Sequence, residues 1–269
     1  MPFAHVRNID VYYEVHGVGP PVLSISGSGN DLRSNPQRGE GPLERHFTTL
    51  SYDQRGLGQT SKPDAPYTMA DYADDAAALL DAIGWESAHV VGLSFGGMVA
   101  QHLAIRHTSR VERLVMGCTS AGGVGGASFD LRLNDAPDPE ARRRRSLELL
   151  DSRCDFSQTP PAIAPGLEPL LVAFARAAAL DPDDPARASG MRRQLDARAA
   201  HDATGGLAGI VSPTLVVGGR YDLQAPLANS EYLARCIPGA RLLVADGGHV
   251  FMLQDPTAWP IIIAFLQSA

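Results

Sequence analysis

The segment Gly92-Leu93-Ser94-Phe95-Gly96 decides the fold of this chain. It has the form Gly-x-Ser-x-Gly and stands between an apolar run at 88–93, which predicts a buried strand, and helical spacing at 96–106. A turn this sharp needs small residues around the serine, because neighbouring backbone must pass close to it. The helix start adds free N–H groups and positive partial charge beside the hydroxyl. We therefore predict that Ser94 is a nucleophile raised above the edge of a sheet.

Outward from this segment, strands and helices alternate along the chain. This alternation predicts a mostly parallel sheet with helices on both faces. An edge hairpin is expected at the N-terminus, where two short segments alternate apolar and polar residues. The expected strands are 3–6, 10–15, 21–25, 47–52, 88–93, 111–118, 214–217 and 241–244, and the expected core helices are 69–83, 96–106 and 257–266.

The alternation breaks at a glycine-rich run over 122–126. From there to residue 210 no strand is evident, and helices are expected at 140–151, 167–179 and 186–201. The sequence therefore predicts an α/β core made of residues 1–121 and 211–269, with residues 122–210 inserted as a helical cap.

Two further residues complete a catalytic pattern with Ser94. A serine hydroxyl is a poor nucleophile without a base, and His249 lies in a glycine loop directly after the last predicted strand. Asp222 follows the strand 214–217 in the same way and is suited to orient the histidine. Because the carboxyl ends of parallel strands meet at one sheet edge, we predict a triad of Ser94, Asp222 and His249.

The same edge of the sheet should also stabilise the oxyanion of a tetrahedral intermediate. One backbone N–H is expected from Phe95, directly after the nucleophile, and the second from Ser28 in the glycine loop after strand 21–25. Phe251 and Met252 flank the histidine loop and are the expected lining of the substrate pocket.

The amino-acid composition limits the kinds of partner that we expect this chain to bind. The 269 residues carry a formal net charge of −7, without a basic excess to neutralise a phosphate backbone, so no nucleic-acid partner is expected. The basic run 142–145 has acidic neighbours and is interpreted as a solvated helix face. Three widely spaced cysteines show no disulfide or metal pattern. Residues 1–10 contain no apolar leader, and no apolar stretch reaches the ~20 residues that span a bilayer, so we expect a cytoplasmic protein without a membrane partner.

These segments together resemble the α/β-hydrolase superfamily over essentially the whole chain. The resemblance rests on the segments 26–29, 53–60, 92–97, 218–222 and 247–249. Within the superfamily the chain is similar to small cap-bearing bacterial hydrolases of the 3-oxoadipate enol-lactonase-like group, through 23–26, 31–33 and 53–58. The resemblance implies an α/β-hydrolase fold and a hydrolytic reaction that needs no metal or organic cofactor.

Two details refine what the resemblance implies. Many members carry His-Gly in the oxyanion loop, where this chain has Ser26-Gly27, and that histidine is not the catalytic base. The departure therefore concerns the packing of the loop. Epoxide hydrolases and haloalkane dehalogenases of this fold use an aspartate as nucleophile, so serine at position 94 favours acyl transfer to water.

We therefore expect a serine hydrolase that cleaves a carboxylic ester or lactone of a small-molecule substrate. Two alternatives stay open: a C–C bond hydrolase acting on a ring-cleavage diketone, and a small-molecule receptor built on the hydrolase fold. Turnover of a coloured dienol would indicate the first, and a partner recruited by ligand would indicate the second. The sequence also allows a homodimer.

Overall fold

A computed structural model describes residues 2–35, 39–134, 138–159, 161–180 and 184–268. Within these residues eight strands form one sheet in the order β1-β2-β4-β3-β5-β6-β7-β8. The first two pairings, β1 with β2 and β2 with β4, are antiparallel, and all the others are parallel. The strands are β1 (Phe3–Val6), β2 (Ile9–His16), β3 (Pro21–Ile25), β4 (Thr48–Tyr52), β5 (Ala88–Leu93), β6 (Val111–Gly117), β7 (Thr214–Gly219) and β8 (Arg241–Ala245). The predicted fold class and edge hairpin are confirmed.

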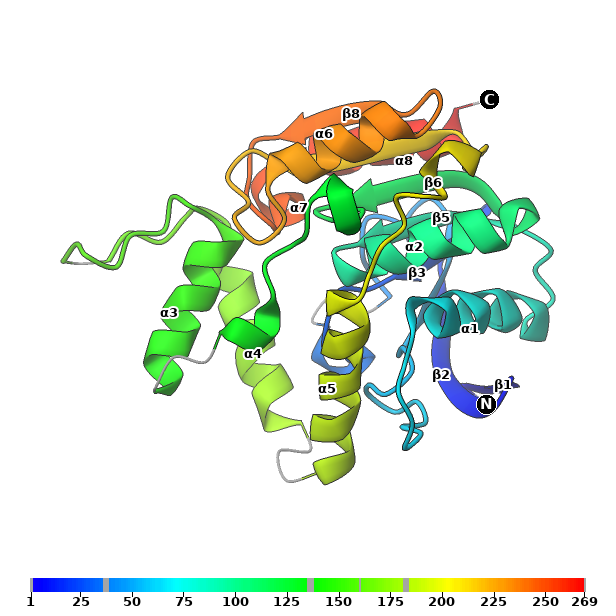
Figure 1. Cartoon of the computed structure of the whole chain (residues 1–269), viewed down its shortest axis with the longest axis horizontal. Helices are drawn as coiled ribbons and strands as arrows, with labels where there is room; N and C mark the ends of the chain where they lie inside the picture. Colours follow the sequence, from blue (N-terminus) through cyan, green and yellow to red (C-terminus); the bar gives the residue numbers. More distant parts are fainter. Residues whose placement is uncertain (1, 36–38, 135–137, 160, 181–183, 269) are drawn as a thin grey trace.

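The central strands are buried on both faces because their apolar side chains alternate between two cores. Along β6, Leu114 and Met116 point into one core and Val115 into the other. Helices α1 (Met69–Ala82), α2 (Phe95–Arg106) and α6 (Leu227–Cys236) cover the first face, and α8 (Ala258–Gln267) covers the second (Figure 1). This layering holds the carboxyl ends of β5, β7 and β8 at one edge.

Two short helices were not predicted from the sequence. Among its large apolar side chains α6 buries only Leu233, so its apolar face is too short to give a helical period. The other, α7 (Phe251–Gln254), is a single turn directly after the histidine loop.

In the part of the chain that the structure describes, three α-helices lie between β6 and β7, and none of the residues there forms a strand. They are α3 (Pro139–Leu150), α4 (Glu168–Ala179) and α5 (Pro185–Ala199), and Figure 1 shows them grouped together to one side of the sheet layers. On α3 the basic run is a solvated face, as predicted: Arg143 and Arg144 pair with Glu140, and all three side chains are about half exposed. None of the helices in the described ranges is long and apolar enough to cross a membrane.

Candidate active site

Ser94 occupies a strained turn between β5 and α2. Its φ of 56° and ψ of −118° lie in a region that side chains with a Cβ rarely adopt. The turn is held from two sides, since the Ser94 N–H donates to the carbonyl of Gly117 at 2.8 Å and the Ser94 carbonyl accepts the Thr119 hydroxyl at 2.8 Å. Such strain persists only where the surroundings over-determine the backbone.

The glycines beside Ser94 are required by close backbone contacts. A Cβ at Gly92 would lie 2.3 Å from the Gly96 carbonyl oxygen, and a Cβ at Gly96 would lie 2.0 Å from the Ile25 carbonyl oxygen. Each distance is far inside van der Waals contact, so a side chain at Gly96 would push the turn away from β3, and one at Gly92 would push α2 away from β5. The Gly-x-Ser-x-Gly pattern therefore has a steric cause in this molecule.

The three residues predicted as a triad come together at the sheet edge. Ser94 Oγ lies 2.9 Å from His249 Nε2, and His249 Nδ1 lies 2.8 Å from Asp222 Oδ2. Ser94 is 8% exposed, His249 6% and Asp222 3%, so water screens these contacts little. The arrangement can move a proton from the serine hydroxyl to an imidazole that a carboxylate orients.

The acid is fixed by its own turn. Asp222 Oδ1 accepts the backbone N–H groups of Gln224 at 2.8 Å and Ala225 at 2.7 Å, which leaves Oδ2 for the imidazole. Because both carboxylate oxygens have donors, the side chain cannot rotate without losing hydrogen bonds.

The histidine loop is held by the last residue of α3 and by the last residue of α7. The His249 N–H donates to the Leu150 carbonyl at 2.6 Å, and the Gly248 N–H donates to Gln254 Oε1 at 2.7 Å. Gln254 Nε2 in turn donates to the buried carboxylate of Asp151 at 2.7 Å. Burial alone would raise the pKa of Asp151, but hydrogen bonds from Arg153 and Gln254 bring it below its usual value.

The loop predicted to hold the oxyanion lies against Ser94. A Cβ at Gly27 would be 3.4 Å from Ser94 Cβ, and both Gly27 and Ser28 line the cavity. Gln54 Nε2 donates to the Ser26 carbonyl at 2.8 Å, and the Gly29 N–H donates to Gln194 Oε1 at 2.8 Å. Phe95 is the first residue of α2, where a backbone N–H has no partner within the helix.

A cavity of about 520 Å³ opens above these residues. Its lining is mainly apolar, with several polar residues among it. The apolar lining residues are Ile25, Leu93, Leu131, Leu149, Leu150, Leu170, Met191, Val250 and Met252, and the polar ones include Ser24, Ser26, Asn30, Ser146 and Gln224. The cavity has the size and character of a small-molecule site.

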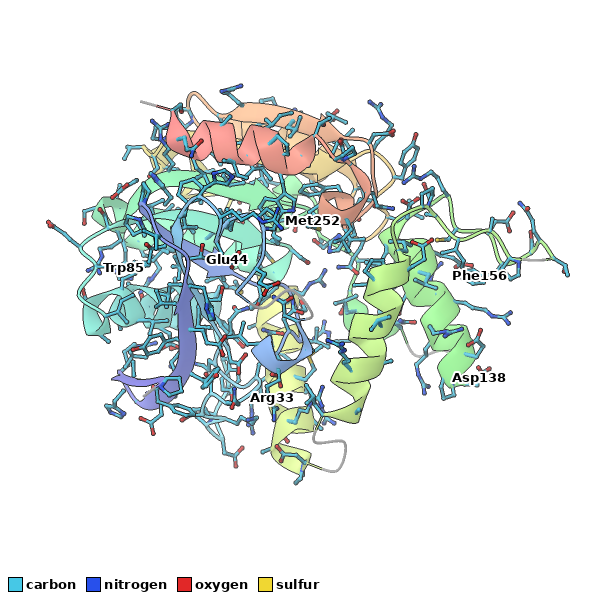
Figure 2. The ribbon with its side chains drawn as sticks, turned by 180° about the vertical axis from the view of Figure 1, so that it is seen from behind. Arg33, Glu44, Trp85, Asp138, Phe156 and Met252 are labelled. Atoms are coloured by element: carbon cyan, nitrogen blue, oxygen red, sulfur yellow. The ribbon has the colours of Figure 1, made fainter. Side chains whose placement is uncertain are left out.

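The two residues predicted to line the pocket have different positions. Met252 lines the cavity, and Figure 2 shows it on the side of the core turned toward the helices between β6 and β7. Phe251 is fully buried in the core, where its ring lies beside Gly117, and it is not among the cavity-lining residues. The expectation for Phe251 is therefore corrected: successive helical side chains point about 100° apart, so only one of the two can face the cavity.

Cys118 lines the cavity as a second nucleophilic side chain. Burial raises the pKa of its thiol well above the usual range, and the nearby Asp222 carboxylate raises it further. The thiol therefore stays neutral and does not compete with Ser94. Across the described ranges we find no group of three or more histidine, cysteine or acidic side chains that could hold a metal ion.

Four glutamines that support this site were missed by sequence reasoning. Gln54, Gln194, Gln224 and Gln254 each bond a backbone group or side chain of a site loop. Only Gln54 had a signal in the sequence, since it belongs to the turn 53–58 that carried the resemblance.

Known proteins are similar to this chain over most of its length. A family model described as alpha/beta hydrolase fold matches residues 20–256. A protein of Azorhizobium caulinodans, provisionally named carbamate hydrolase RutD, is 33% identical over 261 residues, which cover 95% of this chain and 94% of that protein. A 2-hydroxymuconate semialdehyde hydrolase of Pseudomonas putida is 32% identical over 239 residues, with 85% and 79% covered.

A solved structure shows the same likeness. The enol-lactonase from Burkholderia xenovorans LB400 matches with a TM-score of 0.80 at 26% identity, and the match covers 99% of this chain and 100% of that one.

Proposed function

This chain is a hydrolase that belongs to the α/β-hydrolase fold family, and we propose that it cleaves a carboxylic ester or lactone of a small molecule through an acyl-enzyme on Ser94. The superfamily resemblance predicted from its motifs is thereby confirmed. The observation that carries the proposal is the chain of two short hydrogen bonds from Ser94 Oγ through His249 to Asp222, set beneath a mostly apolar cavity.

In the proposed reaction His249 Nε2 takes the hydroxyl proton while Ser94 Oγ attacks the substrate carbonyl. Asp222 keeps the imidazole in the tautomer that leaves Nε2 free to accept. The N–H groups of Phe95 and Ser28 stabilise the oxyanion. A water molecule activated by His249 then releases the acid.

We further propose that residues 122–210 act as a cap on the core. The same cavity is lined by Ser94 and Gly27 from the core and by Leu149, Leu170 and Met191 from the inserted helical region. Substrate choice would therefore depend on side chains from both parts.

The test is hydrolysis of p-nitrophenyl acetate, p-nitrophenyl butyrate and a panel of lactones. We expect Ser94→Ala to lower turnover at least about a thousandfold, because the nucleophile is lost. Ser146→Ala is the matched control, since it removes the same hydroxyl from another serine that lines the cavity. Activity that survives in Ser94→Ala would contradict the proposal.

A second candidate is hydrolysis of a carbon–carbon bond, which the semialdehyde hydrolase relative favours. A muconate semialdehyde contains no ester, so its hydrolysis must break such a bond. The relative that is provisionally named carbamate hydrolase favours a third kind of substrate, a carbamate. Ser94 could attack its carbonyl in the same way. A panel containing an ester, a carbamate and a ring-cleavage dienol of similar size separates these reactions.

A further inference from the structure

Gln224 places a side-chain amide against the base, beside the substrate cavity. Its Nε2 lies 2.7 Å from His249 Nε2, the nitrogen that also lies 2.9 Å from Ser94 Oγ. The side chain is 8% exposed and lines the cavity. Its backbone is fixed on both sides, because its N–H donates to Asp222 and its carbonyl accepts the Phe129 N–H at 2.7 Å. The amide is therefore held near the base before any substrate arrives.

This contact brings two hydrogen-bond donors to His249 Nε2, which can accept a hydrogen bond from only one of them. His249 Nδ1 carries its proton toward Asp222, so Nε2 of the neutral ring has one lone pair. Both the Ser94 hydroxyl and the Gln224 amide lie within hydrogen-bond distance of that lone pair. When the serine proton moves to Nε2, the Gln224 N–H must find another acceptor. The nearest space for that acceptor is the cavity that Gln224 lines.

We propose that Gln224 is a further catalytic residue, whose amide holds the leaving-group heteroatom and later the hydrolytic water next to His249 Nε2. The inference rests on the proposed function of the same site. It assigns a substrate class, namely acyl compounds whose leaving group departs through oxygen or nitrogen.

In the first half Ser94 Oγ bonds to the carbonyl carbon, its proton moves to His249 Nε2, and the C=O π pair moves onto the carbonyl oxygen as the oxyanion. The oxyanion then re-forms the C=O bond while the bond from that carbon to the leaving oxygen breaks, and the proton moves from Nε2 to the leaving oxygen. That oxygen still has lone pairs, and one accepts the Gln224 N–H.

In the second half a water oxygen takes the vacated place beside Gln224. Water gives one proton to His249 Nε2 and bonds to the acyl carbon, whose C=O π pair moves onto oxygen. That pair then re-forms the C=O bond, the bond from the carbon to Ser94 Oγ breaks, and Oγ regains the proton from Nε2.

The geometry also disfavours a carbon leaving group. A carbon atom that takes the proton from Nε2 has no lone pair left for the Gln224 N–H, so a buried donor would lose its partner. A nitrogen leaving group would be served by the other end of the amide, since Oε1 can accept its N–H. The amide thus fits esters, lactones and carbamates, and it works against the carbon–carbon reaction.

The test compares two substrates that form the same acyl-enzyme, ethyl butyrate and p-nitrophenyl butyrate. p-Nitrophenolate is a stable anion that leaves without help, whereas ethoxide must be protonated and held as it leaves. We expect Gln224→Met, which keeps the side-chain length, to lower kcat/KM for the ethyl ester about tenfold to a hundredfold more than for the p-nitrophenyl ester. Gln224→Leu, which also lacks the N–H donor and adds no charge beside His249, should show the same selective loss and serves if the methionine variant does not fold.

Met191→Leu is the matched control, since it changes the packing of the same cavity and should affect both esters equally. Equal losses on the two esters in both Gln224 variants would overturn the role of Gln224 and leave the Ser94 mechanism standing. Failure of the mechanism itself would show separately, as ester turnover that Ser94→Ala does not reduce.

Discussion

The side-chain amide of Gln54 donates to the carbonyl oxygen of Ser26 over 2.8 Å, which ties the turn after β4 to the loop after β3. The preceding residue acts similarly, since the buried carboxylate of Asp53 accepts the N–H groups of Leu32 and Gln59, each at 2.8 Å. The loop that carries Gly27 and Ser28 is therefore held near both of its ends by the neighbouring strand's turn.

Replacing Gln54 with leucine should weaken oxyanion binding. The substitution keeps the size and removes the donor to Ser26, so the loop can drift from Ser94. Because an oxyanion donor acts mainly in the transition state, we expect kcat to fall about tenfold to a hundredfold with little change in KM. Steady-state kinetics on p-nitrophenyl butyrate measure this. Gln59→Leu changes a residue of the same turn whose Nε2 has no hydrogen-bond partner among the described residues, and it should leave kcat nearly unchanged. Similar kcat values for the two variants would refute the idea.

Removing the Cβ of Ser94 should stabilise the fold. With φ at 56° and ψ at −118°, glycine fits the turn better than any residue that carries a Cβ. We expect Ser94→Gly to unfold with a free energy roughly 1 kcal/mol higher than Ser94→Ala, although both lack the serine hydroxyl. Urea denaturation of the two variants isolates the backbone effect. An alanine variant as stable as the glycine variant would show that the turn stores no strain.

The strands and the residues of the proposed triad were accessible from the sequence because each leaves a local pattern. Apolar runs mark buried strands, and Ser94, Asp222 and His249 each follow one. The glutamine supports leave no such pattern. Gln194 lies 165 residues from Gly29, the residue that it contacts. A glutamine is also common on the solvated face of a helix, so only the folded chain identifies its role.

The orientation of single helical turns was also beyond the sequence. Phe251 and Met252 are adjacent apolar residues, and either could face a pocket. The start of α7 at Phe251 turns that ring toward β6 and leaves Met252 for the cavity. A helix of four residues shows no period from which this rotation could be read.

Gln254 should couple the stability of the fold to the histidine loop. Gln254→Leu leaves the Gly248 N–H without its acceptor and takes a donor from the Asp151 carboxylate. We expect the unfolding free energy to fall by about 1–3 kcal/mol. We expect kcat to fall as well, because His249 directly follows Gly248 in the chain. Thermal denaturation and kinetics on one preparation measure both. Gln158→Leu removes an exposed amide that bonds Asp155, and it should change neither quantity. An effect of equal size in that control would place the coupling elsewhere.

His201 should make the protein lose stability in mild acid. Its buried ring bonds the Ser120 carbonyl through Nε2 and His102 through Nδ1. Burial, reinforced by the neighbouring His102 and Arg198, lowers the pKa of His201 from 6.5 to about 4, although the hydrogen bond to the Ser120 carbonyl and the Asp202 carboxylate oppose the shift. Between these two values the unfolded chain binds the proton and the folded protein does not. The unfolding free energy therefore falls as the pH drops from 6.5 toward 4, and above 6.5 it is unaffected by this group.

The full loss through that window is up to about 3 kcal/mol, because each unit of pKa difference is worth about 1.4 kcal/mol. His201→Gln can keep an N–H donor for the Ser120 carbonyl and cannot take up the proton, so its stability should change less between pH 7 and pH 4.5. His5→Gln alters an exposed histidine and should follow the wild-type curve. Urea denaturation at several pH values compares the three proteins. If the His201→Gln curve ran parallel to the wild-type curve, the acid sensitivity would have to come from other groups, and His201 would be protonated in the fold as easily as in the unfolded chain.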